Sequence, residues 1–281
     1  MTDNKIILDK YKLAKALIKD KRYFEAKDIL KELIDMVEPM YVASNDITAP
    51  KYFSFNHVLE TYFYAYFMKD VSPLNYTEYN INDYYRLYGF SLMNVSRYDE
   101  AIIAYNRALL YNPVDVDTYY QLGELYKKTG SIKALKKVTY EVYNFCCTRS
   151  DMARFYRNLG FYYLESHNPR VAKALYKYSN IYYDTRQANS ELEFLARSCG
   201  DNIILADDRD IDLATLQAVL KEYDIPLAPN PDTLGIAFRV GMIERDNGNK
   251  EAAFDCFSMV YDLTMDEAVR EELAKLNFER N

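Results

Sequence analysis

Few side chains in this sequence have the type and spacing that catalysis requires. The two histidines, His57 and His167, lie far apart in the chain, and each is more simply a surface or loop residue than a base or a ligand. The sequence holds no glycine-rich phosphate loop, no His-Glu-x-x-His motif and no Gly-x-Ser-x-Gly motif. We therefore predict that the protein is not an enzyme and that it has no cofactor.

A group of aspartates in the last third of the chain has the chemistry of a calcium site. Its members are Asp201, Asp207, Asp208, Asp210 and Asp212. Their spacing does not follow the EF-hand loop, which also needs a central glycine and a closing glutamate. We interpret the group as a solvated loop in which Asp210 or Asp212 caps the next helix, and we predict no metal site.

The four cysteines, Cys146, Cys147, Cys199 and Cys256, fit neither a disulfide framework nor a zinc site. The adjacent pair Cys146-Cys147 could be redox-active, but buried small hydrophobic side chains are the simpler interpretation. No apolar run is long enough to span a bilayer, and the N-terminus lacks the basic start and apolar run of a signal peptide. We expect a soluble cytoplasmic protein with reduced thiols.

Charged residues that could contact a partner are distributed unevenly. Residues 116–160 contain eight Lys or Arg and four Asp or Glu, whereas residues 187–281 contain nine and twenty. The basic patch from Lys127 to Arg157 could contact a phosphate backbone, which leaves open a ligand- or nucleic-acid-responsive regulator. The net charge of −7 argues against a nucleic-acid partner, and a charge run is more often a solvated face.

The elements that must position these side chains are helices, and the pattern is clearest between Tyr85 and Pro113. The first half of this stretch places residues three or four apart on one helical face: Tyr85, Tyr88, Gly89 and Leu92. The second half alternates bulky and small residues at the same spacing: Tyr98, Ala101, Tyr105 and Ala108. Such knobs and holes favour antiparallel packing of two helices, and Pro113 ends the second one.

The same pattern recurs along the chain. Glycines at the position of Gly89 follow at separations of 34, 37 and 81 residues: Gly123, Gly160 and Gly241. An earlier copy lies within residues 11–30. These residues resemble the tetratricopeptide repeat (TPR) family, whose period is about 34 residues. The sequence departs from the family pattern at Tyr85, where Trp is common, and at Ser96, where Gly is common.

This resemblance implies an all-α fold, a right-handed α-solenoid of antiparallel helix-turn-helix repeats that forms one domain over residues 1–281. Repeats are expected at residues 4–38, 82–115, 116–149 and 150–185, with loops and a divergent repeat at 39–81, a divergent helical pair at 186–225, and a final repeat with a C-terminal capping helix at 226–281. The proline-rich linker from Pro226 to Pro231 is expected to be the most rigid joint in the chain.

The resemblance also implies a function, because the first helices of successive TPR repeats line a groove that takes peptides or partner helices. The groove-facing spacing, carried onto this sequence, selects Arg86, Phe90, Tyr120, Lys127, Arg154, Arg157, Phe161, Phe238 and Arg245. Arg binds carboxylates through two parallel hydrogen bonds, and aromatic rings supply rigid contact area. We therefore predict a non-catalytic scaffold whose protein partner presents an acidic or C-terminal carboxylate group near Arg86, Arg154 and Arg157.

Two further alternatives stay open at this stage. The chain is rich in tyrosine, with 29 Tyr and no Trp, and an aromatic groove could hold a small ligand or, less simply, an enzymatic site. The end hairpins could also mediate self-association. The sequence does not decide whether residues 39–80 pack as a repeat or form an insertion.

Overall fold

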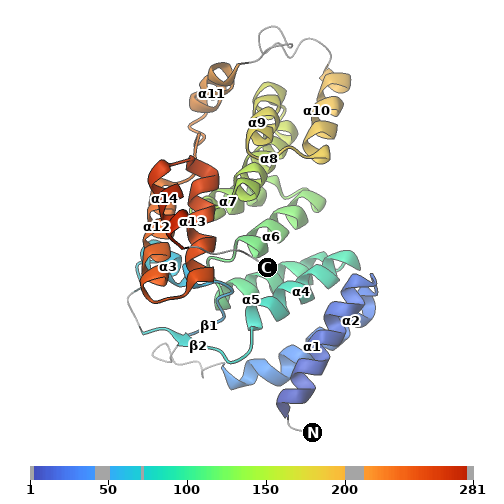
Figure 1. Ribbon diagram of the computed structural model, residues 1–281. Coiled ribbons are helices and arrows are strands. Elements are labelled where there is room, and N and C mark those ends of the chain that lie inside the picture. The colour runs from blue at the N-terminus through green and yellow to red at the C-terminus, as the bar shows by residue number, and fades with distance from the viewer. Residues whose placement is uncertain (1–2, 42–50, 71–72, 200–211, 277–281) are drawn as a thin grey trace. The chain divides into compact units, whose positions relative to one another are not determined.

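The computed structural model describes residues 3–41, 51–70, 73–199 and 212–276 (Figure 1). Their contacts divide the chain into two compact units, residues 1–130 (unit 1) and residues 131–281 (unit 2). Within the described ranges the regular structure is almost wholly helical, which confirms the predicted all-α class. None of these helices is long and apolar enough to cross a membrane.

Unit 1 contains two helix hairpins, a single helix at its C-terminal end and an irregular segment. Its elements are α1 (Asp3–Lys19), α2 (Tyr23–Val37), the short 3₁₀ helix η1 (Glu38–Met40), β1 (Tyr52–Phe53), α3 (Val58–Phe67), β2 (Asn75–Tyr76), α4 (Ile81–Asn94), α5 (Tyr98–Tyr111) and α6 (Val116–Lys128). The hairpins are α1 with α2 and α4 with α5, and α6 packs on α5. Each pair buries its apolar stripe against the next, as in other helical-repeat proteins.

Unit 2 continues with eight described helices. They are α7 (Ile132–Tyr143), α8 (Arg149–Glu165), α9 (Pro169–Tyr182), α10 (Arg186–Cys199), α11 (Leu213–Glu222), α12 (Pro231–Asp246), α13 (Lys250–Thr264) and α14 (Glu267–Lys275). The pairs α8 with α9 and α12 with α13 are hairpins; α7 packs on α8, α10 and α11 pack on α9, and α14 packs on α13. Cys146, Cys147 and Cys256 are buried and form no disulfide, as expected for small hydrophobic side chains.

Three hairpins share one close contact between a glycine and an aromatic ring 16 residues later. The pairs are Gly89 with Tyr105, Gly160 with Tyr176, and Gly241 with Phe257. A Cβ added at these glycines would lie 2.8, 3.2 and 2.7 Å from the nearest ring atom, respectively. The glycine therefore forms the hole and the ring the knob, whereas the sequence pattern had placed the holes at Ala101 and Ala108.

The turn between the two helices of a repeat places one residue in the left-handed region of backbone space. These turn residues are Lys21, Ser96, Gly130, His167 and Gly248, with φ between 58° and 82°. Ser96 occupies this position without the usual glycine, at some cost in backbone energy. His167 is also a turn residue, in agreement with its interpretation as a loop histidine.

The described residues between 39 and 81 do not form a repeat layer between the first hairpin and the next. Helix α2 packs directly against α4, so no described helix of this segment lies between the two hairpins. The described part of the segment contains α3 and a parallel ladder in which Tyr52 pairs with Asn75 and Phe53 with Tyr76. This segment is an insertion between two hairpins that contact each other without it.

The C-terminal half of unit 2 follows the expected helix order, with differences at the ends. A helix expected near 190–205 is α10, which begins earlier, and the capping helix expected near 265–279 is α14. Most of the aspartate group, within residues 200–211, lies outside the described residues. Asp212 caps α11, because its carboxylate accepts a hydrogen bond of 2.7 Å from the Thr215 amide.

Candidate functional site

The first helices of the repeats in unit 1 are α1, α4 and α6, and their neighbouring faces form what we call the first-helix face. Helix α4 contacts both α1 and α6. A hollow of about 200 Å³ opens on this face, lined by Ile18 from α1, by Arg86, Leu87 and Phe90 from α4, and by Gln121 from α6. Two of the residues selected from the sequence, Arg86 and Phe90, thus line one hollow.

The wall of the hollow beside Phe90 is apolar and well supported. The Phe90 ring is partly buried and meets the Tyr23 ring edge-on, at 5.9 Å between ring centres. Ile18 and Leu87 are also partly buried. A rigid ring set among aliphatic side chains offers contact area at low entropic cost, so this wall suits an apolar side chain of a partner.

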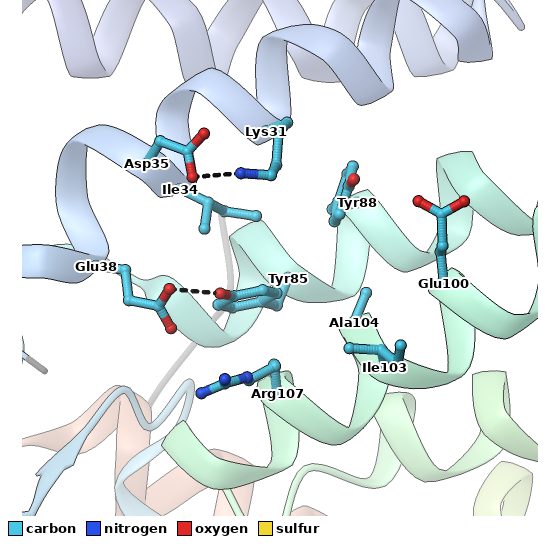
Figure 2. Close-up of a pocket in the computed structure, with 10 residues that line it drawn as sticks. All are labelled: Lys31, Ile34, Asp35, Glu38, Tyr85, Tyr88, Glu100, Ile103, Ala104 and Arg107. Carbon is cyan, nitrogen blue, oxygen red and sulfur yellow. Dashed lines mark hydrogen bonds and ion pairs between the residues drawn. The ribbon is translucent and has the colours of Figure 1, made fainter. Parts of the chain in front are cut away.

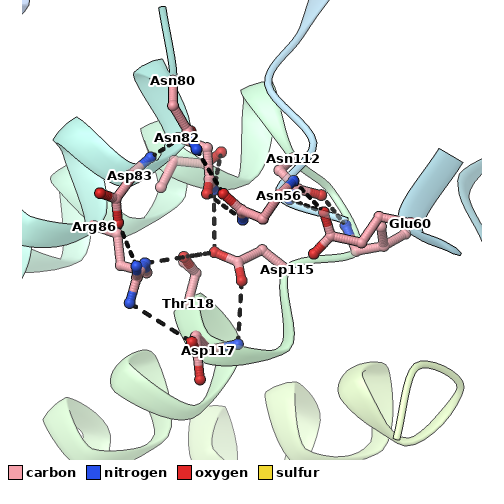
Figure 3. Close-up of polar contacts among 12 residues, drawn as sticks. Asn56, Glu60, Asn80, Asn82, Asp83, Arg86, Asn112, Asp115, Asp117 and Thr118 are labelled. Carbon is pink, nitrogen blue, oxygen red and sulfur yellow. Dashed lines mark hydrogen bonds and ion pairs between the residues drawn. The ribbon is translucent and has the colours of Figure 1, made fainter. Parts of the chain in front are cut away.

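Arg86 is already neutralised by carboxylates of its own unit (Figure 3). Its guanidinium forms an ion pair with Asp83, and it lies 4.0 Å from an Asp115 oxygen and 3.7 Å from an Asp117 oxygen. Three carboxylates around one guanidinium leave an excess of negative charge. That Arg86 grips a partner's carboxylate stays a prediction, and the charges around Arg86 oppose it, because such a group would be repelled by Asp83 and Asp117.

The ion cluster is one end of a buried polar network that the sequence analysis did not find. Asn82, which is fully buried, donates to the Ala108 carbonyl and, at 3.1 Å, to Asp115. Asn56, in the insertion, donates to the Asn82 side-chain oxygen at 3.0 Å. The sequence indicates only one local feature of this network, the helix caps. Asn80 and Asp115 are of the residue types that cap helices, and they cap α4 and α6.

At the other end of the network, Glu60 joins the insertion to the turn after α5. Its carboxylate accepts hydrogen bonds from the Asn56 and His57 amides and, at 2.9 Å, from the Asn112 side chain. Burial, together with the nearby charge of Asp115, raises the pKa of Glu60 to about 7. Burial likewise raises the pKa of Asp115. This network therefore contains a carboxyl, Glu60, that changes its protonation near neutral pH.

The remaining predicted residues of unit 1, Tyr120 and Lys127, lie on α6. Tyr120 is buried, with 1% of its surface exposed, so it belongs to the core and does not line an open groove. The Lys127 ammonium forms an ion pair of 2.9 Å with Glu124 one turn away. Neither residue lines the hollow, and neither contributes an unbalanced positive charge to the first-helix face.

In unit 2 the predicted residues lie on two helices. Arg154, Arg157 and Phe161 are all partly buried on α8, and the Arg157 guanidinium lies 3.4 Å from the Tyr183 carbonyl oxygen. On α12, the Phe238 ring packs on Phe257 at 5.6 Å between centres.

The other predicted residue on α12, Arg245, forms ion pairs with Asp246 and with Glu272 of α14. Arg245 therefore joins the capping helix to its hairpin. The sequence pattern had instead suggested that Arg245 contacts a partner.

A second hollow of about 260 Å³ is lined by side chains of α2, η1, α4 and α5 (Figure 2). Its polar groups are largely paired with one another, since the Tyr85 hydroxyl donates to Glu38 at 2.7 Å and Lys31 forms an ion pair with Asp35. Tyr111 also donates to Glu38, at 3.2 Å. Polar groups that are paired with one another are typical of a contact between two helices. This hollow is therefore the weaker candidate for a binding site.

Comparison with known protein families identifies one segment of the chain. Residues 96–130, which cover the turn before α5, α5 itself and α6, match the family model described as TPR repeat. None of the curated proteins matches the chain. Repeats of this family generally mediate protein–protein interaction. Residues 96–130 are therefore similar to tetratricopeptide repeats, and the helix hairpins of both units give the described residues a helical-repeat fold.

Proposed function

We propose that the chain is a non-catalytic scaffold that binds a segment of a partner protein on the first-helix face of unit 1. The observation that carries this proposal is the hollow between Ile18, Leu87, Phe90 and Gln121, which three successive first helices build together. It lies where the family resemblance implies a groove, and its apolar wall needs an apolar side chain to fill it.

The charges beside the hollow indicate what flanks that apolar side chain. Asp83, Asp115 and Asp117 outnumber Arg86, and Asp117 is the most exposed of the three, at 66% of its side-chain surface. A Lys or Arg in the partner segment would meet this excess negative charge, whereas a carboxylate would not. We therefore propose a partner segment with an apolar residue next to a basic one. An acidic partner group at Arg154 and Arg157 stays a separate prediction.

The test starts from a random peptide library selected against the purified chain, followed by affinity measurement for the selected peptides. Gln121→Trp fills the hollow from its rim, and Lys12→Trp places the same ring on an exposed position of α1 outside the hollow. We expect peptides rich in Lys or Arg next to an apolar residue, with at least a roughly tenfold loss of affinity for Gln121→Trp and none for Lys12→Trp.

Selected peptides whose affinity is the same for both variants would remove the hollow from the proposal. Selected peptides that are acidic, and that bind less tightly to the double variant Arg154→Glu, Arg157→Glu, would move recognition to α8 and support the carboxylate prediction there.

A further inference from the structure

A short proline-rich segment of unit 2 lies against α7, α8 and α9, where tyrosine hydroxyls hold its backbone. Four tyrosines form what we call the tyrosine cradle: Tyr143 of α7, Tyr156 of α8, and Tyr178 and Tyr182 of α9. Their hydroxyls donate to three consecutive carbonyls, from Tyr156 to Pro226 at 2.9 Å, from Tyr178 and Tyr182 to Leu227 at 2.7 and 3.1 Å, and from Tyr143 to Ala228 at 2.8 Å.

The cradle is rigid because its rings pack on one another. The Tyr156 ring lies at its centre, 4.8 Å from the Tyr178 ring and 5.5 Å from the Tyr182 ring. Tyr156 is fully buried, and Tyr178 is 3% exposed. Burial raises the pKa of Tyr182 to about 12 and that of Tyr156 further, so the hydroxyls keep their protons and act as donors at any physiological pH.

The chemistry of the segment matches that of the cradle. Pro226, Pro229 and Pro231 have no backbone N–H, so residues 226–231 are rich in acceptors and poor in donors. The cradle presents hydroxyl donors to that backbone. Ile225 and Pro229 are buried on either side of the three bonded carbonyls, and they fix the segment's position along the helices.

Contacts beyond the prolines anchor the far end of the segment. The Asn230 side chain donates to the Asn144 side chain at 2.8 Å, and the Thr233 hydroxyl donates to the Asn144 carbonyl at 2.6 Å. The segment is tied to α11 before it and α12 after it, so it is present at the cradle at a high effective concentration. A free peptide of the same chemistry would have to compete with this tethered segment.

We propose that the tyrosine cradle is a binding site for proline-rich peptide segments, and that residues 225–230 of the chain itself occupy it and keep it closed. Recognition rests on hydroxyl donors that contact backbone carbonyls and on the burial of proline and aliphatic side chains such as Pro229 and Ile225. Aromatic grooves that bind proline-rich ligands use the same physics, because proline reduces the entropy lost on binding. This site is independent of the first-helix face of unit 1.

The test opens the cradle and adds the segment back as a free peptide. In the opened variant Pro226→Gly, Leu227→Ser, Ala228→Gly, Pro229→Ser, the linker keeps its length and Pro231 but loses Pro226, Pro229 and the aliphatic side chain of Leu227. The probe is a fluorescent peptide with the sequence of residues 224–231, measured by fluorescence anisotropy. We expect the opened variant to bind it at least about tenfold more tightly than the intact chain does.

Two controls tie binding to the cradle and to proline. Adding Tyr143→Phe and Tyr182→Phe to the opened variant keeps both rings but removes two donors, and we expect affinity to fall by about tenfold or more. A peptide in which alanine replaces the prolines should bind more weakly by a similar factor. The milder variant Pro226→Gly, Pro229→Gly gives the same readout if the fourfold change impairs folding, which circular dichroism will reveal.

A folded opened variant that does not bind the peptide at millimolar concentration would overturn the proposal. Equal binding by the variant that lacks the two hydroxyls, or equal binding of the alanine peptide, would also overturn it. In either case the cradle would be a packing contact that holds the linker and nothing more.

Discussion

Both units hold an irregular segment against helix hairpins, but they use different chemistry to do so. In unit 1 the insertion is tied to α4 and to the turn after α5 by carboxylates and amides, with Asn56 bound to Asn82 and Glu60 bound to Asn112. In unit 2 the linker before α12 is held by four neutral tyrosine hydroxyls, with Tyr156 at their centre. In the first arrangement burial raises the pKa of Glu60 to about 7, whereas in the second burial raises tyrosine pKa values that are already far above neutrality.

The difference follows from what it costs to bury each kind of group. An ionised carboxylate loses much of its hydration when buried, so it takes up a proton at a pH where an exposed one is charged. A phenol is neutral already, and burial only makes its proton harder to remove. The binding of a segment anchored by carboxylates therefore depends on their protonation. The binding of a segment anchored by tyrosine hydroxyls is expected to stay constant over the physiological pH range.

The largest expected effect is on the pH dependence of stability at Glu60. Its pKa is about 7 in the folded chain against a usual 4.5, so the folded state binds a proton that the unfolded state has released. The resulting stabilisation is complete below about pH 4.5 and is lost as the pH rises through 7. Between pH 5 and 8 we expect wild type to lose about 2–3 kcal/mol relative to Glu60→Gln, measured by urea unfolding with circular dichroism.

The matched control for this change is Asp9→Asn, which removes a carboxyl from an exposed position of α1. It should follow wild type at every pH. A Glu60→Gln variant that also follows wild type would show that the network in unit 1 is as indifferent to pH as the tyrosine cradle, and the contrast between the units would fail.

A smaller effect tests whether the two units share the same scaffold beneath these segments. Gly89→Ala in unit 1 and Gly241→Ala in unit 2 both push a methyl group into an aromatic ring, so each should destabilise the chain by about 1–2 kcal/mol. Gly235→Ala lies on the same helix as Gly241 with nothing within 4 Å, and it should stabilise by about 0.5–1 kcal/mol.

Thermal unfolding by circular dichroism measures all three glycine variants. A stabilised Gly241→Ala would mean that the Phe257 ring yields without cost. A large difference in stability between Gly89→Ala and Gly241→Ala would mean that the hairpins of the two units do not pack alike. The two units would then differ in their helix hairpins as well as in their irregular segments.

The smallest effect compares two wholly buried tyrosines, one in each unit. Tyr156 donates to the Pro226 carbonyl, whereas the Tyr105 hydroxyl has no hydrogen-bond partner in the described structure. Tyr156→Phe leaves a carbonyl without its donor and should cost about 1 kcal/mol, whereas Tyr105→Phe removes an unsatisfied group and should be neutral or slightly stabilising. Urea unfolding at one pH distinguishes them, and equal losses would contradict the assigned hydrogen bonds.

Much of the fold could be predicted because its rules are local. The spacing around Gly89, Leu92 and Tyr105 predicts two helices and the contact between them, and the recurrence of that spacing predicts further hairpins. Asp212 at the start of α11 could be identified from residue type alone. These features depend on neighbours within about one repeat.

The candidate site was predictable only in part, because its charges depend on distant residues. Repeat spacing places Arg86 and Phe90 on one face, and they do line one hollow. It does not reveal that Asp115 and Asp117, from the next helix, surround Arg86, nor that Glu272 pairs with Arg245. From residue type alone, these arginines were predicted to contact a partner. In the structure their charges are balanced by carboxylates of their own unit.

The sequence by itself determined the helix hairpins, because glycine, alanine and aromatic residues at fixed spacing leave one way to pack two helices. Only the tertiary structure decided that the first hairpin contacts α4 directly, with residues 39–81 set aside as an insertion, and that Pro226 to Ala228 lie on the tyrosine cradle. The physical reason is that hydrogen bonds from side chains to backbone carbonyls leave no periodic trace in a sequence. They join residues 45 to 85 positions apart, and only the folded chain brings these together.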